Sequence, residues 1–304
     1  MILHHNNNIH NRNKVQQTRP IVCGHRGVPY KSLENTRHGF QTAHALGCDE
    51  VELDVFLLKC GTLCVFHGNG TDQNPGLLSD YSTNMYGSIL EYTYNDLKDK
   101  VIFNSDYEEF GCGPSIIKVL EDSDECYIPT LEQVLIDAKK SGLTVKIELK
   151  GPGTVEPTLE LVEKLDMVSQ CHYGSFELSR IRRVRELRPQ RHTFTNEHVY
   201  KTGALFDKVP SNFIEMALDV DASEVHLKYS SCTKSRVNDI HAAGMDSMCW
   251  FRGPVGMKDD VAFKYDDVGN EDEMMFRIVM ATGVRKMCVN KADVLIQMFD
   301  SQYE

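Results

Sequence analysis

The chain has 304 residues, of which 41% are hydrophobic and 25% charged, and its mean hydropathy is -0.35. This composition supplies a large apolar core and excludes disorder over the whole length. The 44 acidic residues outnumber the 33 basic ones, which gives a formal net charge of -11 at pH 7. A charge of this sign opposes nonspecific attraction to nucleic acid and to anionic lipid, so we expect no nucleic-acid partner.

The amino-terminal segment is rich in Asn and His and lacks the apolar run of a signal peptide. We predict that residues 1–19 are disordered and that one folded domain covers residues 20–304. No stretch reaches the roughly 18 apolar residues of a membrane span, which predicts no transmembrane segment and indicates a cytoplasmic location. The ten cysteines form no CxxC pair, so we interpret them as reduced packing thiols.

Apolar runs of strand length alternate with helical patterns from Pro20 onwards, without a linker between two halves. This order favours a single α/β domain. The first strand is predicted at 21–23, and a helix is predicted from Asn35 or Thr36 to Gly47. His25 therefore lies just past the carboxyl end of a strand.

Two later runs, 50–55 and 144–150, alternate strictly between apolar and charged residues. The charged faces consist of Glu50, Glu52 and Asp54 in the first run and of Lys146, Glu148 and Lys150 in the second. A half-exposed edge strand would give the same alternation, so either run alone leaves that alternative open. Together they favour a (β/α)8 barrel, in which inward residues near the strand ends line the mouth.

The rest of the chain supports the same architecture. A capping box at Thr130 and a stop at Gly142 predict a helix before the second alternating run. Further strands are predicted at 167–172, 193–195, 224–227, 246–251 and 286–289, and further helices at 177–187, 233–243 and 271–282. Residues 68–127 lack a clear crossover helix, so we predict an insertion over the mouth after the second strand. Either a lid that selects substrates or a surface excursion would fit this segment.

Three carboxylates meet in the predicted mouth, those of Glu52, Asp54 and Glu148. Their mutual repulsion predicts a bound cation, and all-oxygen ligands favour Mg2+, Ca2+ or Mn2+. Cys60, Cys64 and His67 come close to zinc-ligand spacing. They lie on a predicted hairpin without a fourth ligand, so zinc is the weaker alternative.

Two histidines are expected beside these carboxylates. If Cys60-Gly61 forms a two-residue turn, the hairpin register places Asp54 opposite His67. His25 adds a second imidazole from a neighbouring strand end, and both rings can transfer protons near neutral pH. Each histidine alone is more often structural, so the prediction depends on their joint placement. Arg26 and Lys150 are candidates for contacts with phosphate oxygens, with surface salt bridges as the alternative.

These segments resemble the glycerophosphodiester phosphodiesterase family, which has a TIM-barrel fold. The resemblance is dense over residues 21–67 and 128–150 and thin elsewhere. The matching segments are His25-Arg26-Gly27, Glu34-Asn35-Thr36, Val51-Glu52-Leu53-Asp54-Val55, Val65-Phe66-His67, Ile128-Pro129-Thr130-Leu131-Glu132 and Ile147-Glu148-Leu149-Lys150. Weaker similarities follow at Ser175-Phe176, Trp250, Gly283-Val284 and Val289-Asn290.

The resemblance implies a site and a reaction. The implied roles are metal ligation by Glu52, Asp54 and Glu148, acid–base catalysis by His25 and His67, and substrate binding by Arg26, Lys150, Glu34 and Trp250. The implied reaction is metal-dependent hydrolysis of a small glycerophosphodiester to glycerol 3-phosphate and an alcohol. The alternatives are a lysophospholipase D or sphingomyelinase D type activity, for example on a lysophospholipid, and a noncatalytic barrel that binds a phosphate ligand.

The sequence departs from the family pattern at three places. Gly68 stands where the family has Asp, and the arginine usual a few residues later is missing before Asp80. The Trp-Thr-x-Asn element reads Trp250-Phe251-Arg252-Gly253, and the Thr-Asp-x-Pro element reads Val289-Asn290-Lys291-Ala292. The sequence therefore predicts the reaction class better than the alcohol released. It leaves open which histidine is the base, whether a cyclic phosphate forms, and the oligomeric state.

Overall fold

The computed structural model describes residues 19–71, 74–78, 82, 84–98, 128–253 and 270–301. The predicted disordered segment, apart from its last residue, lies outside these ranges. None of the described helices is both long and apolar enough to cross a membrane.

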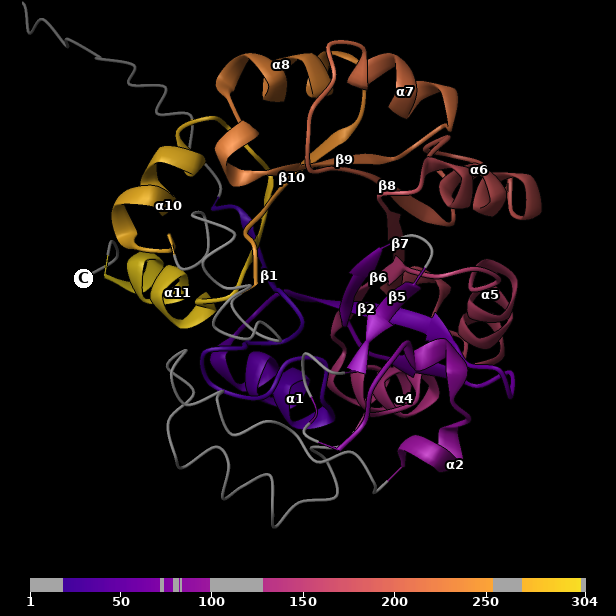
Figure 1. Ribbon diagram of the computed structural model, residues 1–304. Coiled ribbons are helices and arrows are strands. Elements are labelled where there is room, and N and C mark those ends of the chain that lie inside the picture. The colour runs from indigo at the N-terminus through magenta and orange to yellow at the C-terminus, as the bar shows by residue number, and fades with distance from the viewer. Residues whose placement is uncertain are drawn as a thin grey trace, which may run out of the picture.

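Eight parallel strands of the described chain close into a barrel (Figure 1). Their order is β1-β11-β10-β9-β8-β7-β6-β2, and β1 closes the ring by pairing with β2. The strands are β1 (Ile21–Gly24), β2 (Glu50–Leu57), β6 (Thr144–Leu149), β7 (Cys171–Ser175), β8 (Lys201–Phe206), β9 (Glu224–Lys228), β10 (Asp246–Trp250) and β11 (Lys286–Val289). The predicted (β/α)8 barrel is therefore confirmed.

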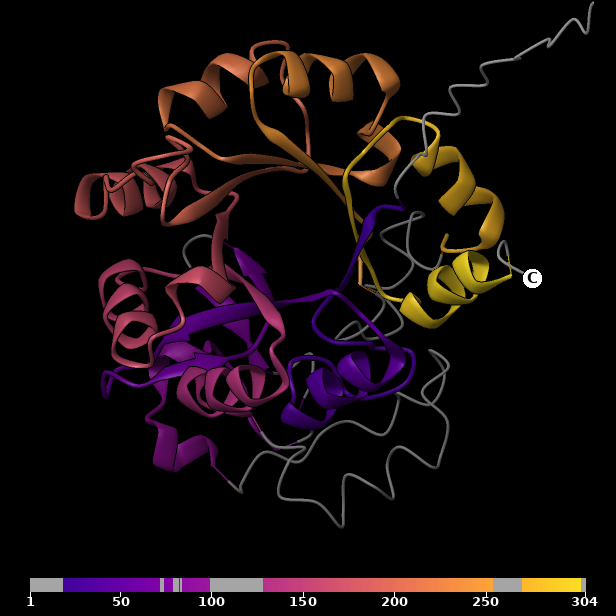
Figure 2. The same ribbon diagram turned by 180° about the vertical axis from the view of Figure 1, so that it is seen from behind.

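Helices surround this barrel, as the two opposite views show (Figures 1 and 2). They are α1 (Arg37–Leu46), α4 (Leu131–Ser141), α5 (Val155–Lys164), α6 (Leu178–Leu187), α7 (Phe213–Asp219), α8 (Lys234–Ala242), α10 (Glu273–Met280) and α11 (Ala292–Asp300). The helix boundaries follow local chemistry. Thr36 caps α1 by accepting a hydrogen bond from the Gly39 N–H, and Thr130 and Gln133 form the predicted capping box of α4.

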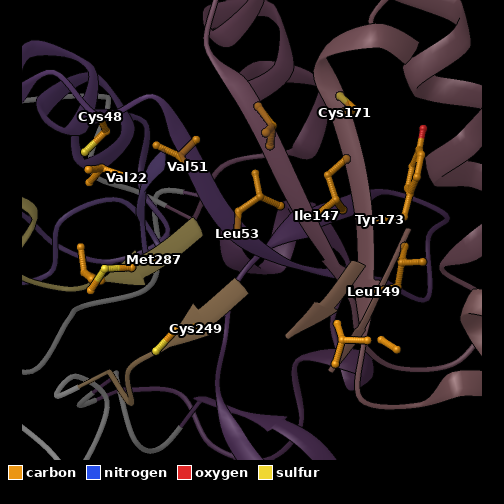
Figure 3. Packing of buried hydrophobic residues seen from close by; sticks show 14 of the residues in the cluster. Val22, Cys48, Val51, Leu53, Ile147, Leu149, Cys171, Tyr173, Cys249 and Met287 are labelled. Carbon is orange, nitrogen blue, oxygen red and sulfur yellow. The ribbon is translucent and has the colours of Figure 1, made fainter. Parts of the chain in front are cut away.

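The outward faces of the strands form the main hydrophobic core between barrel and helices. Leu53 of β2 and Ile147 of β6 are fully buried there, together with the other apolar residues of the two alternating runs (Figure 3). Burial of each such side chain contributes about 1.5–3 kcal/mol, so the outward face fixes the strand positions. The charged residues of the same strands must then point into the barrel, as predicted.

The first charged positions of the two alternating strands form a buried ionic network inside the barrel. Lys146 Nζ lies 2.7 Å from one carboxylate oxygen of Glu224, and Lys286 Nζ lies 2.7 Å from the other. Both lysines also lie 3.4 Å from Glu50. Two positive and two negative charges thus balance below the mouth, as buried charges require.

The predicted hairpin register after β2 is wrong by one residue. Strand β3 (Leu63–Val65) pairs antiparallel with β2, and the Leu58 N–H donates to the Thr62 carbonyl. The loop therefore holds three residues and not two, with Gly61 in the left-handed region at φ 83°. Phe66, not His67, lies opposite Asp54 and donates its N–H to that backbone carbonyl. His67 lies beyond the strand, where the pleat no longer fixes its side-chain direction.

Two predicted strands are also misplaced. The run predicted at 167–172 is a strand only from Cys171, and the run predicted at 193–195 is a turn in which Phe194 is fully exposed. The true strand, β8, contains Gly203, where a Cβ atom would lie 2.6 Å from the His226 ring. Close packing on a neighbouring strand therefore required a glycine that weakened the strand pattern.

The described part of the predicted insertion packs on a small core that it shares with β2 and β3. It contains β4 (Asn69–Thr71), β5 (Asn74–Leu77), the 3-10 turn η2 (Ile89–Glu91) and the short helix α2 (Tyr94–Leu97). Tyr92 and Tyr94 pack against a cluster that includes Phe56 and Ile89, whereas Tyr86 is 64% exposed. Residues 99–127 of the predicted insertion lie outside the described chain, so the role of the insertion stays a prediction.

Candidate active site

A cavity of about 170 Å³ opens at the carboxyl ends of the barrel strands. Seven of the nine candidate residues line it, namely His25, Arg26, Glu52, His67, Glu148, Lys150 and Trp250. The other two, Asp54 and Glu34, lie behind this lining and contact it. The barrel thus brings together residues that are up to 225 positions apart in the chain, from His25 to Trp250.

The turn after β1 directs a backbone N–H toward the carboxylates. Arg26 adopts a left-handed conformation at φ 53°, which is unfavourable for a residue with a side chain, and its N–H donates to Glu52 Oε2 at 3.0 Å. Gly27 follows at φ 90°, and a Cβ atom there would lie 2.9 Å from the backbone of Gly39. The strained turn is therefore held between Glu52 and α1.

Three carboxylates form a cluster at the ends of β2 and β6. Glu52, Asp54 and Glu148 each offer one oxygen within 4.8 Å of the other two. Their side chains are 12%, 1% and 12% exposed. Glu52 Oε1 is buried and accepts no hydrogen bond from the described residues. An unsatisfied buried oxygen within an all-oxygen cluster fits the ligand preference of a hard divalent cation.

Burial and mutual repulsion disturb the acidity of this carboxylate cluster. Burial, followed by repulsion from Asp54 and Glu148, raises the pKa of Glu52 well above its usual value. Burial raises the pKa of Glu148 to about 7, although Lys150 acts in the opposite direction. Burial would also raise the pKa of Asp54, but the charges of Lys150, His67 and Arg26 lower it below its usual range. A cation bound to the cluster would stabilise all three charged forms.

Asp54 is held by groups on three sides. Lys150 Nζ lies 3.1 Å from Oδ1, and Asn35 Nδ2 donates to Oδ2 at 3.0 Å. Arg26 Nε lies 3.4 Å from Oδ2, while Arg26 Nη1 donates to Glu34 at 3.0 Å. Glu34 therefore contacts Arg26 and does not line the cavity, so any effect of Glu34 on a substrate would act through Arg26. Asn35 lies within a matched segment, but its contact with Asp54 was not anticipated.

A chain of hydrogen bonds fixes the orientation of the His25 ring. His25 Nδ1 lies 2.9 Å from Asn290 Oδ1, and Asn290 Nδ2 donates to the Arg252 carbonyl and to Glu271. Because both amide hydrogens of Asn290 are used, its oxygen must accept, and His25 must carry its proton on Nδ1. The lone pair of His25 Nε2 then faces the cavity, 3.8 Å from Glu52 Oε2.

Both imidazoles at the cavity are neutral at pH 7 in the metal-free protein. Burial, followed by the charge of Arg26, lowers the pKa of His25 to about 3. Burial, followed by Arg26 and Lys150, lowers the pKa of His67 well below its usual value. Neutral imidazoles accept protons, and an anionic phosphate beside them would raise both pKa values.

Glu271 anchors Asn290 and was missed by the sequence analysis. Its carboxylate accepts the backbone N–H groups of Asn290 at 2.8 Å and Lys291 at 3.0 Å, besides the Asn290 side chain. Burial raises the pKa of Glu271 to about 7. Asn290 lies in one of the weaker family similarities, but nothing in the sequence pattern pointed to Glu271, 19 positions earlier.

Two aromatic side chains, Phe176 and Trp250, line the cavity near a position at which the sequence departs from the family pattern. Phe176 packs edge-on against Trp250 at 5.6 Å, and the Arg252 guanidinium lies 5.8 Å from the Trp250 ring centroid. Trp250 Nε1 is buried and donates no hydrogen bond within the described chain. A Cβ atom at Gly253, where the family has Asn, would lie 3.0 Å from Arg26 Nη1. Arg26 thus occupies the space beside this glycine.

The barrel is closed and parallel, and carboxylates, imidazoles and positively charged side chains line a cavity at the carboxyl ends of its strands. This arrangement is that of an α/β-barrel enzyme. The model of the Glycerophosphoryl diester phosphodiesterase family matches residues 25–252. That range contains nine of the eleven described strands and most of the candidate site, so the chain belongs to this family.

Individual relatives agree with this assignment. A glycerophosphodiester phosphodiesterase of Bacillus altitudinis is 33% identical over 168 residues, which cover 52% of this chain and 60% of that protein. A glycerophosphodiester phosphodiesterase of Caldanaerobacter subterraneus subsp. tengcongensis is 26% identical over 76% of this chain and 84% of its own length. A phosphodiesterase of Oleispira antarctica, solved with the product sn-glycerol-3-phosphate, has the same fold with a TM-score of 0.65. It is 20% identical, and the match covers 92% of this chain and 97% of that one.

Proposed function

We propose that this enzyme hydrolyses glycerophosphodiesters to glycerol 3-phosphate and an alcohol. The observation that carries the proposal is that His25 and His67 line one cavity beside a cluster of three carboxylates, in a chain of this family. The product bound by the Oleispira antarctica relative supports the choice of substrate class. Arg26 and Lys150 line the same cavity and supply positive charge for a phosphodiester anion.

Glu52, Asp54 and Glu148 would hold a divalent cation, Mg2+, Ca2+ or Mn2+. When bound there, the cation supplies a charge that stabilises the negative charge developing on phosphate oxygens. The unsatisfied Glu52 Oε1 and the absence of sulfur from this cluster support a hard ion.

The protonation of His25 suggests how the two imidazoles divide the work. His25 donates its Nδ1–H to Asn290, so its Nε2 lone pair takes the proton of the attacking hydroxyl group. His67, after it has gained a proton beside the bound anion, donates that proton to the oxygen of the departing alcohol. Arg26 and Lys150 hold the phosphate between the two rings.

The size of the cavity favours a small leaving group. Its volume of about 170 Å³ is close to the roughly 150 Å³ of a cavity that holds benzene, which is too small for an acyl chain. Its wall is nevertheless apolar at Leu205, Met248 and Trp250, and Phe176 at the rim is 43% exposed. Lysophospholipids, with the acyl chain outside, are therefore the second substrate class to test.

The test is turnover of a substrate panel with identification of both products. Glycerophosphocholine, glycerophosphoethanolamine, glycerophosphoglycerol and a lysophospholipid are each incubated with Mg2+, Ca2+ or Mn2+ and with a chelator. We expect glycerol 3-phosphate from the glycerophosphodiesters and no turnover with the chelator. Lysophosphatidic acid from the lipid alone would favour the lipid alternative. Phosphate-ligand binding without turnover under any condition would favour the noncatalytic barrel.

Removal of the Asn290 side chain should impair catalysis without removing substrate contacts. The N290A variant frees the His25 ring to rotate and to change its protonated nitrogen, so we expect kcat to fall by about 10-fold to 100-fold with little change in KM. Steady-state kinetics and thermal unfolding of the variant measure this effect. The double variant N290D/E271Q exchanges the acid and the amide and keeps an acceptor for His25 Nδ1–H. It should recover part of the lost kcat, whereas a purely structural role predicts no recovery.

Cation affinity should rise with pH up to about pH 7. In the metal-free protein the pKa of Glu148 is raised from 4.5 to about 7, so binding at lower pH must displace a proton. We expect a loss of Mg2+ or Ca2+ affinity of at least about tenfold per pH unit below pH 7, measured by calorimetry, because the raised pKa of Glu52 acts in the same direction. The same shift means that the folded state binds more protons than the unfolded state between pH 4.5 and 7. The metal-free protein should therefore lose stability as the pH rises through this window. An E148Q variant with the same pH dependence would contradict the assignment.

A further inference from the structure

Cys288 of β11 places a sulfur atom at the wall of the cavity. Its side chain is 2% exposed and lines the cavity together with His25 and Glu52. Cys288 lies in β11, His25 directly follows β1 and Glu52 lies in β2, and these three strands are neighbours in the barrel. One imidazole nitrogen, one carboxylate oxygen and the Cys288 Sγ all lie within 4.8 Å of one another.

These three donors differ in chemistry from the carboxylate cluster beside them. A nitrogen, an oxygen and a sulfur ligand suit zinc, whereas the all-oxygen cluster suits a hard cation. Zinc bonds of about 2.0–2.3 Å place ligand atoms roughly 3.5 Å apart, so atoms that lie within 4.8 Å of one another need to approach by at most about 1.3 Å. Glu52 Oε1 accepts no hydrogen bond from the described residues, so turning this carboxylate toward zinc breaks no bond at that oxygen.

His25 is already oriented as a metal ligand. Histidines that bind metals usually donate their second ring N–H to a carboxylate, carbonyl or water, which fixes the free nitrogen toward the ion. His25 donates Nδ1–H to Asn290, which Glu271 holds in turn, and its Nε2 lies 3.8 Å from Glu52. The outer partners required by a metal-binding imidazole are therefore in place.

We propose that His25 Nε2, Glu52 and Cys288 Sγ form a zinc site next to the carboxylate cluster. Glu52 belongs to both sites, so only one of the two metals can use it at a time. On binding, a Zn–S bond forms and the thiol proton leaves to solvent, with no change of oxidation state. Three protein ligands leave a fourth position for water, which the cavity can hold. Zinc at this site removes the His25 lone pair and one ligand of the hard cation. It therefore inhibits the hydrolysis, a consequence that rests on the proposed function.

Cobalt is the probe for the site because thiolate-bound Co2+ has a charge-transfer absorption band in the near ultraviolet. The full chain and its C288S variant are titrated with Co2+, and zinc affinity is measured by competition. We expect the band in the wild type and its loss in C288S, with zinc affinity weaker by at least about tenfold. Any cobalt bound by His4, His5 or His10 would be held through nitrogen and would not contribute to this band.

Two matched variants control for a second thiol near the site and for an exposed thiol of the described chain. C23S changes the buried thiol that forms a hydrogen bond with Cys288, and C60S removes an exposed thiol. Both should keep the band. Persistence of the band in C288S, or its loss in C23S or C60S, overturns the ligand set.

The inhibition is measured separately with the substrate that the wild type turns over. Zinc should inhibit the wild type competitively with the hard cation and inhibit C288S at concentrations at least about tenfold higher. Zinc that binds through Cys288 without inhibition overturns the regulatory part of the proposal. If no substrate is turned over, the proposed function fails, but the cobalt band still decides whether the site exists.

Discussion

Replacement of His67 or His25 by alanine is expected to lower kcat by about 100-fold to 10,000-fold each, because a positioned proton transfer contributes that much to a rate. Substrate affinity should change far less, since Arg26 and Lys150 remain to bind the phosphate. Full kinetic constants and circular dichroism spectra of both variants test this expectation. Their pH profiles should each lose one limb of the bell-shaped wild-type curve.

His226 offers a matched control for these two variants. Its ring lines the same cavity but forms its hydrogen bond with Glu224 in the ionic network below the mouth. H226A therefore enlarges the cavity by the same side chain without removing a proposed proton-transfer group, and kcat should fall by less than about tenfold. A folded H67A or H25A variant with the activity of H226A would remove that histidine from the mechanism.

The carboxylates of the site could be predicted because strand alternation is a strong local signal. In β2 and β6 every second residue is apolar and fully buried, so Glu52, Asp54 and Glu148 had to point into the barrel. The hairpin register could not be predicted from the same pattern, because the loop takes in Lys59 as a third residue when Gly61 adopts the left-handed conformation. His67 nevertheless reaches the cavity, since it lies past the end of β3.

The partners of His25 could not be predicted because they depend on long-range geometry. Asn290 lies 265 positions from His25, and only closure of the barrel between β1 and β11 brings them together. Cys288 belongs to the run Lys286–Val289, which is buried at every position and so shows no alternation that would identify its inward residues. The sulfur ligand of the proposed zinc site was invisible in the sequence for this reason.

The three substitutions E52Q, D54N and E148Q are expected to weaken binding of the hard cation and to lower activity accordingly. Each replaces a charged oxygen donor by an amide of nearly the same size, so the barrel should stay folded while the ion loses a strong ligand. Loss of the cation should destabilise the transition state by several kcal/mol, because negative charge would then develop on the phosphate oxygens without a neighbouring positive ion.

Asp207 provides the control for charge alone. It lies next to Arg252 and Lys228, outside the carboxylate cluster, and its side chain is 44% exposed. D207N therefore removes one negative charge close to the cavity without removing a proposed ligand. Cation titration by calorimetry, with circular dichroism to check folding, should show weaker binding in the three cluster variants and wild-type affinity in D207N.

Of the three cluster variants, D54N should bind the cation most weakly, because Asp54 alone among the three carboxylates has a lowered pKa and is charged without the cation. Unchanged affinity in two of the three variants would mean that the cation, if one binds, is held elsewhere, and the mechanism would then depend on the two imidazoles, Arg26 and Lys150 alone.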